Sequence, residues 1–271
     1  MFLRKATVMV SVSIISSHRR RPRLTLHSHN DASWSGQRPS ATHQIFNAGI
    51  SDLTLLFSPP HPVDACLAID SGIGQELSAC KKSAVKIAVL AEPRANNRYG
   101  HDLAREWADH VDLILTYDDA ILKELGPKAK FFPLGGSFLW GRERLVGQDK
   151  TRLVSISASR KQSLPGHALR HAAIARFSNH SLEAFGRAYK KYRSPTTPHR
   201  QFLFSAVIEN SQEPYYFTEK LIHCLLYRTV PIYWGALKLP SEFEESGIIR
   251  FENLDQLEDI LNQIDESRYQ K

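Results

Sequence analysis

The stretch from residue 202 to residue 236 constrains the fold of this chain more than any other part of the sequence. It begins with the apolar run FLFSAVI at 202–208, which is typical of a strand buried on both faces of a parallel sheet. From Thr218 onward, apolar residues recur at the spacing of one helix face, and TVPIYW at 229–234 resumes a strand pattern. Pro231 argues against a central, fully hydrogen-bonded position for this second strand. We therefore expect a strand, a loop, a helix and a strand in succession.

Polar residues follow the first of these strands. Glu209, Asn210 and Ser211 come directly after it, and ligands of open α/β sheets bind beside the carboxyl ends of the strands. Glu219 and Lys220 fall in the first turn of the expected helix, where free backbone N–H groups and the helix dipole favour a phosphate group. From the residues alone, two interpretations are open: a diphosphate site, or an ordinary βαβ unit whose charged residues are solvated.

This stretch resembles the donor-binding motif of glycosyltransferase family 10, the α1,3-fucosyltransferases. The family motif runs approximately FENS…YVTEKL…GxVPVxxG, and this chain has ENS, YFTEKL and VPIYWG in the same order and at the same spacing. Phe217 stands where the family usually has valine. The agreement favours the diphosphate site. The matching positions are Glu209, Asn210, Ser211, Tyr216, Thr218, Glu219, Lys220, Val230, Pro231 and Gly235.

The resemblance implies a fold and a reaction. It implies the GT-B fold, an α/β architecture of two Rossmann-like, doubly wound domains facing a cleft. The implied reaction is the inverting transfer of L-fucose from GDP-fucose to a hydroxyl group of a glycan or glycolipid acceptor. The chain contains no D-x-D pair, the carboxylate motif with which other glycosyltransferases hold Mn²⁺. We therefore expect no metal and no cofactor besides the nucleotide-sugar co-substrate.

The same resemblance implies roles within the motif. Asn210 and Tyr216 would orient the donor, and Lys220 would stabilise charge on the departing diphosphate. Glu219 would accept hydrogen bonds from the ribose hydroxyl groups. Two alternatives stay open: the same fold with another donor such as UDP-xylose, because nothing in the motif identifies the sugar ring, and a non-catalytic nucleotide-sugar-binding or glycan-binding protein.

A second polar loop precedes this motif. The strand pattern at 152–157 is followed by the loop SASRKQSLPG and by a helical pattern in which His167 and Arg170 share a face. The family has an Arg here that contacts the donor diphosphate, which implies this role for Arg170, because a guanidinium can hold phosphate oxygens bidentately. Without the resemblance, Arg170 would be a surface residue of an amphipathic helix. Ser159, Arg160 and His167 are further candidates for donor contacts.

In the amino-terminal half, strand and helix patterns alternate from residue 52 onward. The alternation predicts βαβ units and a parallel, doubly wound sheet. Four glycines within 133–150 predict a linker, so we expect an acceptor-side domain at 1–140 and a nucleotide-sugar-binding domain at 151–271. The expected strands lie at 52–57, 85–92, 111–117 and 129–135, with helices near 73–81, 101–109 and 118–125.

A candidate catalytic base lies in VLAEPRANN, residues 89–97. Glu92 follows an apolar strand directly and precedes Pro93, so we expect it at the carboxyl edge of the sheet. In the family a Glu closely followed by Pro serves as the catalytic base at a comparable position, commonly as E-S-P rather than EP. The resemblance implies this role for Glu92; from the residues alone it is equally a solvated loop carboxylate. Arg94 and Asn96 are weaker candidates for substrate contacts.

The charge of the chain favours an anionic partner. The 271 residues carry a formal net charge of +7 at pH 7, which suits a sugar nucleotide, a glycolipid phosphate or a membrane surface. The basic residues are scattered and form no zinc-finger or RNA-binding signature, so we expect no nucleic-acid partner. Cys66, Cys80 and Cys224 have no metal-type spacing and are expected to be reduced thiols.

The first 45 residues are basic and carry little motif information. Their longest apolar run, VMVSVSII at 8–15, is far shorter than the ~20 residues that a membrane-spanning helix needs. The segment is compatible with a cleaved targeting sequence, or with a first strand followed by an irregular loop. We expect a cytoplasmic protein, peripheral to a membrane at most, without a transmembrane segment.

Overall fold

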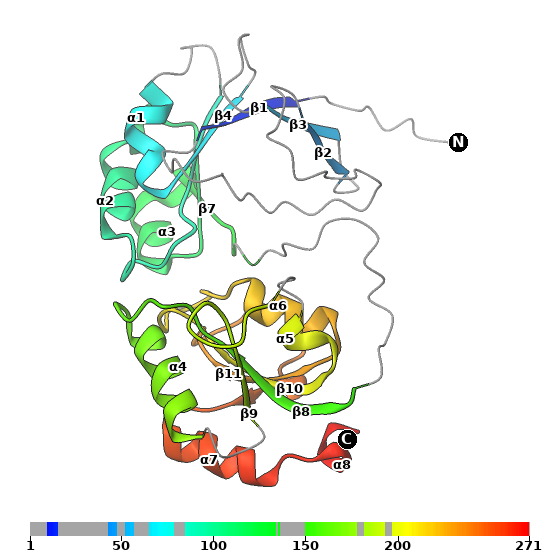
Figure 1. Cartoon of the computed structure of the whole chain (residues 1–271). Helices are drawn as coiled ribbons and strands as arrows, with labels where there is room; N and C mark the ends of the chain where they lie inside the picture. The colour runs from blue at the N-terminus through cyan, green and yellow to red at the C-terminus, as the bar shows by residue number, and fades with distance from the viewer. Residues whose placement is uncertain are drawn as a thin grey trace. The chain divides into compact units, whose positions relative to one another are not determined.

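The structure, a computed structural model, shows a chain of two compact α/β units (Figure 1), which are described separately. One unit contains Met1–Phe132 and Trp140–Glu143, and the other contains Pro133–Leu139 and Arg144–Lys271. The structure describes residues 10–15, 43–47, 52–56, 65–78, 85–133, 135, 150–177, 182–192 and 197–270. Most of the predicted linker at 133–150, and most of the predicted irregular segment at 1–45, lie outside the described residues.

The first unit is built on a seven-stranded sheet. Its strands are β1 (Val10–Ile15), β2 (His43–Asn47), β3 (Asp52–Leu56), β4 (Ala65–Ile69), β5 (Val85–Val89), β6 (Leu113–Thr116) and β7 (Ala129–Phe131). They lie in the order β2-β3-β1-β4-β5-β6-β7, and neighbours are parallel except β2 and β3. The order reverses between β1 and β4, which is the switch point of a doubly wound sheet.

Three helices of the first unit lie on the same side of this sheet (Figure 1). They are α1 (Ile73–Ser78), α2 (Arg98–Glu106) and α3 (Asp119–Leu125), accompanied by the 3₁₀ turns η1 (Asp70–Gly72), η2 (Ala108–His110) and η3 (Gly126–Lys128). Because the strands β4, β5 and β6 are parallel, η1, the loop before α2 and the loop before α3 all leave the same edge of the sheet. The core contains Ile73, Leu77, Ala88, Leu103, Ile114 and Ile121.

The second unit contains a five-stranded, fully parallel sheet. Its strands are β8 (Arg152–Ser157), β9 (Leu182–Phe185), β10 (Phe202–Ile208), β11 (Val230–Trp234) and β12 (Ile249–Arg250), in the order β12-β11-β10-β8-β9. Strand β10 is buried at every residue, as its continuous apolar run predicts. The sheet order reverses between β8 and β10, so this unit is also doubly wound. The predicted α/β fold class is confirmed.

The expectation drawn from Pro231 was wrong for the strand as a whole but holds at the proline itself. Strand β11 lies between β10 and β12 rather than at the edge of the sheet. Strand β12 pairs only with Ile232 and Tyr233, so Pro231 is paired on the β10 side, where it is opposite Ser205, and has no partner residue in β12. The missing N–H of proline is tolerated because β12 is too short to reach it.

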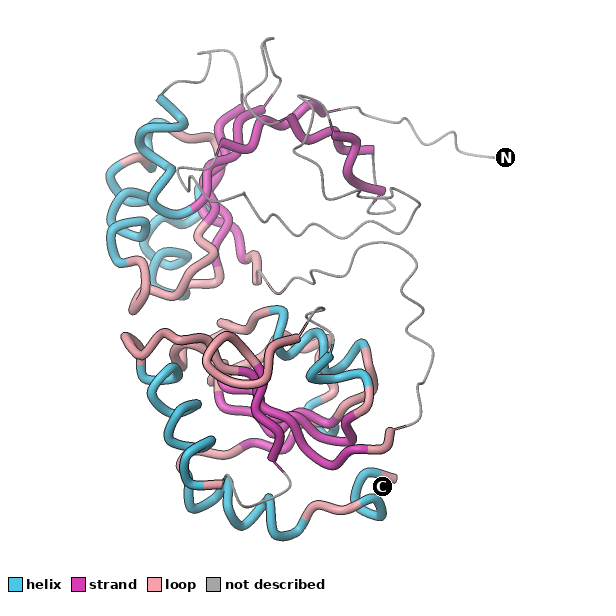
Figure 2. Tube along the Cα trace, viewed as in Figure 1, coloured by secondary structure: helices cyan, strands magenta, loops and turns pink. Residues whose placement is uncertain are grey.

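Helices cover both faces of this second sheet, and strand and helix alternate along it (Figure 2). The helices are α4 (Pro165–Arg176), α5 (Thr197–Arg200), α6 (Glu219–Leu226), α7 (Leu254–Gln263) and α8 (Glu266–Tyr269), with η4 (Glu245–Gly247). Side chains of α4 and α7 pack with Phe204, Ala206 and Ile208 of β10. Side chains of α6 pack with Val207. Because alternate residues of a strand point to opposite faces, α6 covers the face opposite to α4 and α7.

Candidate functional site

The predicted donor residues lie at the switch point of the second sheet. Ser159 and Arg160 lie on the loop that leaves β8, and Asn210 lies on the loop that leaves β10. The two strands are neighbours, and the chain leaves them in opposite directions across the sheet. A crevice beside the carboxyl ends of such strands is where doubly wound proteins bind nucleotides.

Helix α4 begins against the loop after β10. Pro165 occupies the first helical turn, where its missing N–H costs no hydrogen bond. The backbone N–H of Gly166 donates to the carbonyl oxygen of Asn210 at 3.0 Å. A Cβ at position 166 would lie 1.7 Å from the carbonyl oxygen of Glu209. Only glycine therefore allows the first turn of α4 to approach this loop so closely.

Replacing Gly166 with alanine is expected to destabilise the second unit. The methyl group would overlap a backbone carbonyl that cannot rotate away, and overpacking of this kind costs about 1–3 kcal/mol, more than the ~1 kcal/mol that alanine gains in helix propensity. Urea unfolding measures the change. Gly247→Ala is the matched control, because a Cβ there meets nothing within 4 Å. Equal unfolding free energies for the two variants would contradict the prediction.

Arg170 and Asn210 are hydrogen-bonded to each other at the carboxyl edge of the second sheet. Arg170 is only 3% exposed; its Nε donates to the carbonyl oxygen of Ile208 at 2.7 Å, and its Nη2 donates to Oδ1 of Asn210 at 3.0 Å. The Nδ2 of Asn210 donates to the hydroxyl oxygen of Tyr216 at 3.3 Å. Burial lowers the pKa of Arg170, which is ordinarily so high that the guanidinium stays charged. Arg170 thus fixes Asn210 and Tyr216, and its Nη1 has no hydrogen-bond partner among the described residues.

A buried carboxylate fixes the first turn of α6. Glu209 is fully buried and accepts hydrogen bonds from the backbone N–H of Thr218 at 2.8 Å and from the Thr218 hydroxyl at 2.8 Å. The same carboxylate lies 3.4 Å from Nζ of Lys220. Thr218 is the N-cap of α6, so Glu209 determines where this helix begins and where Lys220 points.

The charges of Glu219 and Lys220 are coupled. Their side-chain charges lie 3.4 Å apart. Burial alone would lower the pKa of Lys220, but the carboxylates of Glu219 and Glu209 raise it above its usual value. Burial alone would raise the pKa of Glu219, and the Lys220 charge lowers it below its usual value. Both groups are therefore charged at neutral pH, at the positive end of the α6 dipole.

The Nδ1 atom of His167 is a buried polar atom of this edge without a hydrogen-bond partner among the described residues. His167 is 4% exposed, and an unpaired nitrogen is uncommon in such a position. Burial lowers the pKa of His167, and the charges of Arg170 and Lys161 lower it further. Lys220 acts on the ring in the same direction, so the N-termini of α4 and α6 bring cations together around His167. The arrangement can bind an anion with several oxygen atoms.

The first unit has a polar edge of its own around Glu92. Glu92 follows β5 on the loop before α2, as predicted, and its Oε2 accepts a hydrogen bond from Nδ2 of Asn96 at 2.8 Å. The carboxylate of Asp70, at the end of β4, accepts from the backbone N–H groups of Ala91 at 2.9 Å and Glu92 at 3.3 Å. Glu92 is only partly buried, so its carboxylate can reach solvent.

Asp70 is both buried and conformationally strained. It has a φ of 53°, a left-handed conformation that is uncommon outside glycine. Burial raises its pKa from 3.8 to about 6, against the opposing effect of the hydrogen bonds from Ala91 and Glu92. Asp70 was not among the predicted site residues, because the strand that ends at it was not predicted either.

The raised pKa of Asp70 predicts a pH-dependent stability. The folded state binds this proton more tightly than the unfolded chain, so its stabilising effect is complete below pH 3.8 and is lost as the pH rises through about 6. The shift corresponds to about 3 kcal/mol. The unfolding free energy of wild type minus that of Asp70→Asn should therefore fall by up to this amount between pH 4 and pH 7. A difference that does not change with pH would contradict the prediction.

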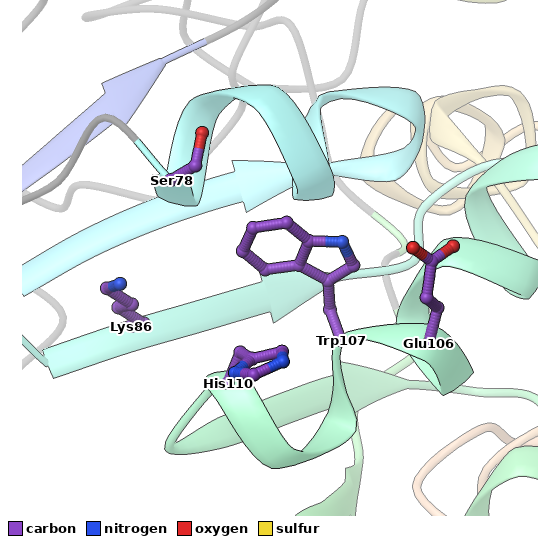
Figure 3. Close-up of a pocket in the computed structure, with 5 residues that line it drawn as sticks. All are labelled: Ser78, Lys86, Glu106, Trp107 and His110. Atoms are coloured by element: carbon purple, nitrogen blue, oxygen red, sulfur yellow. The ribbon is translucent and has the colours of Figure 1, made fainter.

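A separate pocket of the first unit contains none of these residues. It is lined by Ser78, Lys86, Glu106, Trp107 and His110 (Figure 3). Lys86 lies at the start of β5, whereas Glu92 follows the end of that strand. The pocket is therefore at the amino edge of the parallel strands, opposite to the edge at which doubly wound sheets bind ligands.

Three other properties concern the described part of the chain alone. Its residues contain no group of three or more His, Cys, Asp or Glu side chains that could hold a metal ion. Cys224 on α6 is a buried free thiol, as predicted, and burial raises its pKa to about 12. Among the described helices, none has the length and apolar character needed to cross a membrane.

The structure brings eight of the nine predicted site residues into the second unit. Glu92 belongs to the first unit. Sequence reasoning missed the structural roles of Glu209 and Gly166; Glu209 was visible as part of the ENS motif, but its burial was not. The eight residues of the second unit are Ser159, Arg160, His167, Arg170, Asn210, Tyr216, Glu219 and Lys220.

Comparison with solved structures relates the fold to known glycosyltransferases. An α1,3-fucosyltransferase is similar with a TM-score of 0.56 and 15% identity, over 96% of this chain and 78% of that chain. An α1,3-fucosyltransferase solved with GDP-fucose has a TM-score of 0.54 and 14% identity, over 100% of this chain and 82% of the other. TarM has a TM-score of 0.51 and 11% identity, over 74% of this chain and 47% of its own. The fold is thus that of α1,3-fucosyltransferases, in agreement with the predicted GT-B architecture.

The sequence comparison identifies the second unit. No curated protein matches the chain. Residues 147–271 match the family model described as Glycosyltransferase family 10 (fucosyltransferase) C-term, and this range includes β8 to β12 and the eight predicted residues of the second unit. Residues 147–271 therefore form the C-terminal domain of glycosyltransferase family 10, the fucosyltransferase family.

Proposed function

We propose that this protein is an inverting glycosyltransferase that transfers L-fucose from GDP-fucose to a hydroxyl group of a glycan or glycolipid. In this reaction the acceptor oxygen attacks the anomeric carbon of fucose and the bond to the diphosphate breaks. A general base takes the hydroxyl proton, and GDP leaves. The chemistry therefore needs a base and a cationic site that stabilises the departing diphosphate.

The observation that carries the proposal is the arrangement of cations at the switch point of the second sheet. Lys220 lies in the first turn of α6 and is held by Glu209 at 3.4 Å, so its ammonium is oriented before any ligand binds. His167 contributes a buried nitrogen without a partner among the described residues, and Arg160 is exposed on the neighbouring loop. The Lys220 ammonium contacts the oxygen atoms of Thr218, Glu209 and Glu219, so a diphosphate would bind it in exchange for one of these contacts. Arg160, His167 and the N-termini of α4 and α6 would add further contacts to the diphosphate oxygens.

The remaining residues of the motif are assigned to the nucleoside and sugar. Asn210 and Tyr216 are linked by a hydrogen bond of 3.3 Å, and Arg170 donates a hydrogen bond to Oδ1 of Asn210. Both side chains are therefore held in place, as residues that orient a ligand need to be. Glu219 carries a carboxylate that can accept hydrogen bonds from ribose hydroxyl groups. Ser159 accepts a hydrogen bond from the N–H of Lys161 at 3.2 Å, so it orders the loop that carries Arg160.

Glu92 is assigned as the general base. The residue is partly exposed and its carboxylate accepts a hydrogen bond from Asn96 at 2.8 Å, while its backbone N–H donates to Asp70. A base needs both properties, since the carboxylate must reach a hydroxyl group and its geometry must be reproducible. The assignment gives the first unit the acceptor chemistry and the second unit the donor chemistry.

Thermal unfolding with a panel of nucleoside diphosphates tests the donor assignment. A ligand that binds only the folded state stabilises it by about 2.7 kcal/mol at a concentration of 100 times its Kd. We expect GDP to raise the midpoint temperature of thermal unfolding more than UDP, ADP or CDP. GMP should raise it less than GDP because GMP lacks the second phosphate. Lys238→Met, at an exposed lysine, is the control for Lys220→Met, in which the GDP effect should be lost.

Turnover separates the proposed reaction from the alternatives. Wild type should release GDP from GDP-fucose slowly in water and faster with a suitable glycan acceptor. If UDP raised the midpoint more than GDP did, the donor would be a UDP-sugar such as UDP-xylose. If GDP-fucose bound without any turnover across an acceptor panel, the protein would be a binding module. No stabilisation by any nucleoside diphosphate would contradict the proposal as a whole.

A further inference from the structure

The carbonyl group of Glu92 is held by two buried side chains from different elements. The hydroxyl group of Tyr117, which follows β6, donates to the Glu92 carbonyl oxygen at 3.2 Å. The Nε2 atom of His101, on α2, lies 3.1 Å from the same oxygen. His101 is fully buried and Tyr117 is 1% exposed. Together with Asp70 on the N–H side, these contacts fix the backbone of Glu92 at both ends.

Both ring nitrogens of His101 contact hydrogen-bond acceptors. The Nδ1 atom lies 3.0 Å from Oδ2 of Asp118, and Nε2 contacts a carbonyl oxygen, which has no proton to give. A neutral imidazole has one N–H and one bare nitrogen, so it can satisfy only one of these contacts. The geometry therefore favours an imidazolium that donates from both nitrogens.

The charges around the ring agree with this protonation state. Burial alone would lower the pKa of His101, but the hydrogen bond and charge of Asp118, with the Glu92 carbonyl and the Asp70 charge, raise it above its usual value. The hydrogen bond from His101 in turn lowers the pKa of Asp118. On the same helix, Arg105 donates from Nη1 to the carbonyl oxygen of His101 rather than to the ring. The other charged residues of α2, Arg98, Asp102 and Glu106, are exposed.

Local structure fixes the partners of this imidazolium. Oδ1 of Asp118 caps α3 by accepting from the N–H of Ala120 at 2.8 Å, which leaves Oδ2 for His101. The residue before His101 is Gly100, where a Cβ would lie 2.9 Å from the carbonyl carbon of Asp70. Glycine at this position lets α2 approach the end of β4, so Asp70 and His101 reach the two sides of the same backbone segment.

We propose that His101, as an imidazolium held by Asp118, is a positioning residue for Glu92. It neither touches substrate nor transfers a proton; it holds the carbonyl group of Glu92 so that the carboxylate stays directed for base catalysis. The inference rests on the proposed function, in which Glu92 is the general base. Hydrogen-bond partners that orient the ligands of metal sites contribute about 10–100-fold to affinity or activity, and we expect an effect of the same order from this contact.

Two variants test the role, with a third as control. His101→Asn keeps one donor but cannot hold both acceptors. Asp118→Asn removes the counter-charge of His101 while asparagine preserves the N-cap of α3. Both should lower kcat for fucose transfer by about 10–100-fold and leave KM for GDP-fucose unchanged. His110→Asn, at an exposed histidine outside this cluster, should behave as wild type.

The protonation state has two readouts that a merely structural role would not change. In long-range ¹H–¹⁵N spectra of the wild-type protein, both ring nitrogens of His101 should carry protons at pH 7, and Asp118→Asn should lose one of them. In kinetics, kcat of the wild-type enzyme should fall at alkaline pH as His101 loses its proton. This fall should occur at lower pH in Asp118→Asn and should be absent in His101→Asn. The spectra need no activity, so they remain decisive if a variant folds poorly.

The outcomes separate this inference from the proposed function. A wild-type His101 ring with one unprotonated nitrogen at pH 7 would overturn the inference. So would His101→Asn and Asp118→Asn with the kcat of the His110→Asn control, in a protein that Glu92→Gln inactivates. If Glu92→Gln itself retained wild-type kcat, the base assignment would fail first, and the positioning role would fall with it.

Discussion

Glu209→Ala is expected to destabilise the protein by about 3 kcal/mol, near the lower end of the 3–5 kcal/mol lost when one partner of a buried ion pair is removed. The variant leaves the N–H and the hydroxyl group of Thr218 without their acceptor. It also removes one of the two carboxylates beside the Lys220 ammonium, the other being that of Glu219. The lower end applies because the Lys220 side chain retains 25% exposure. Urea unfolding measures this loss, and GDP affinity should fall with it because α6 no longer begins in a fixed geometry.

Two further variants identify the cause of this loss. Glu209→Gln keeps an oxygen acceptor for the Thr218 N–H and removes only the charge. It should therefore lower the unfolding free energy less than Glu209→Ala does. Glu252→Ala removes an exposed carboxylate of the same unit and should be nearly neutral. If Glu209→Ala were as stable as Glu252→Ala, Glu209 would not be the residue that fixes the start of α6.

Glu92→Gln is expected to lower kcat for fucose transfer by about 10²–10⁴-fold, the usual contribution of a general base. The amide is isosteric with the carboxylate and can keep a hydrogen bond with Asn96, but it cannot accept the proton of the acceptor hydroxyl group. Affinity for GDP should be unchanged, because the proposed donor residues lie in the second unit. Single-turnover kinetics with GDP-fucose and a glycan acceptor measure the effect.

A matched carboxylate gives the control for this experiment. Glu106→Gln changes an exposed Glu of the same unit that lies at the pocket of Figure 3, away from the carboxyl edge of the sheet. It should retain wild-type kcat. Glu92→Gln with unchanged kcat, or with a loss equal to that of Glu106→Gln, would exclude Glu92 as the base.

Periodicity and strand composition were sufficient to predict most of the second unit. The strands at 152–157 and 202–208 have the bounds that the sequence predicts. The apolar run at 202–208 is buried at every residue, as expected for an inner strand of a parallel sheet. Helix α6 begins at Glu219, since Thr218 caps it and the apolar spacing starts there. The candidate residues of the motif were selected because they lie near strand ends, where doubly wound sheets bind ligands, and because they match the motif of glycosyltransferase family 10.

Contacts between distant segments could not be predicted in this way. Strand β4 carries few signals that distinguish it from a loop, and Asp70 at its end reaches Ala91 only through tertiary structure. The need for glycine at position 166 arises from a carbonyl oxygen 43 positions away along the chain (209 − 166). Pro231 correctly indicated a position that is not paired on both sides, but it did not predict that β11 lies inside the sheet. The reason is that the partner strand β12 is only two residues long, a length that no local pattern indicates.

A crystal structure of the full chain with GDP would show directly whether the second unit binds the diphosphate where the first turns of α4 and α6 converge. We expect diphosphate oxygens within hydrogen-bond distance of Lys220 and of the side chain of His167 or Arg170. A diphosphate bound elsewhere, such as in the pocket of Ser78 and Trp107 (Figure 3), would exclude the second unit as the donor site.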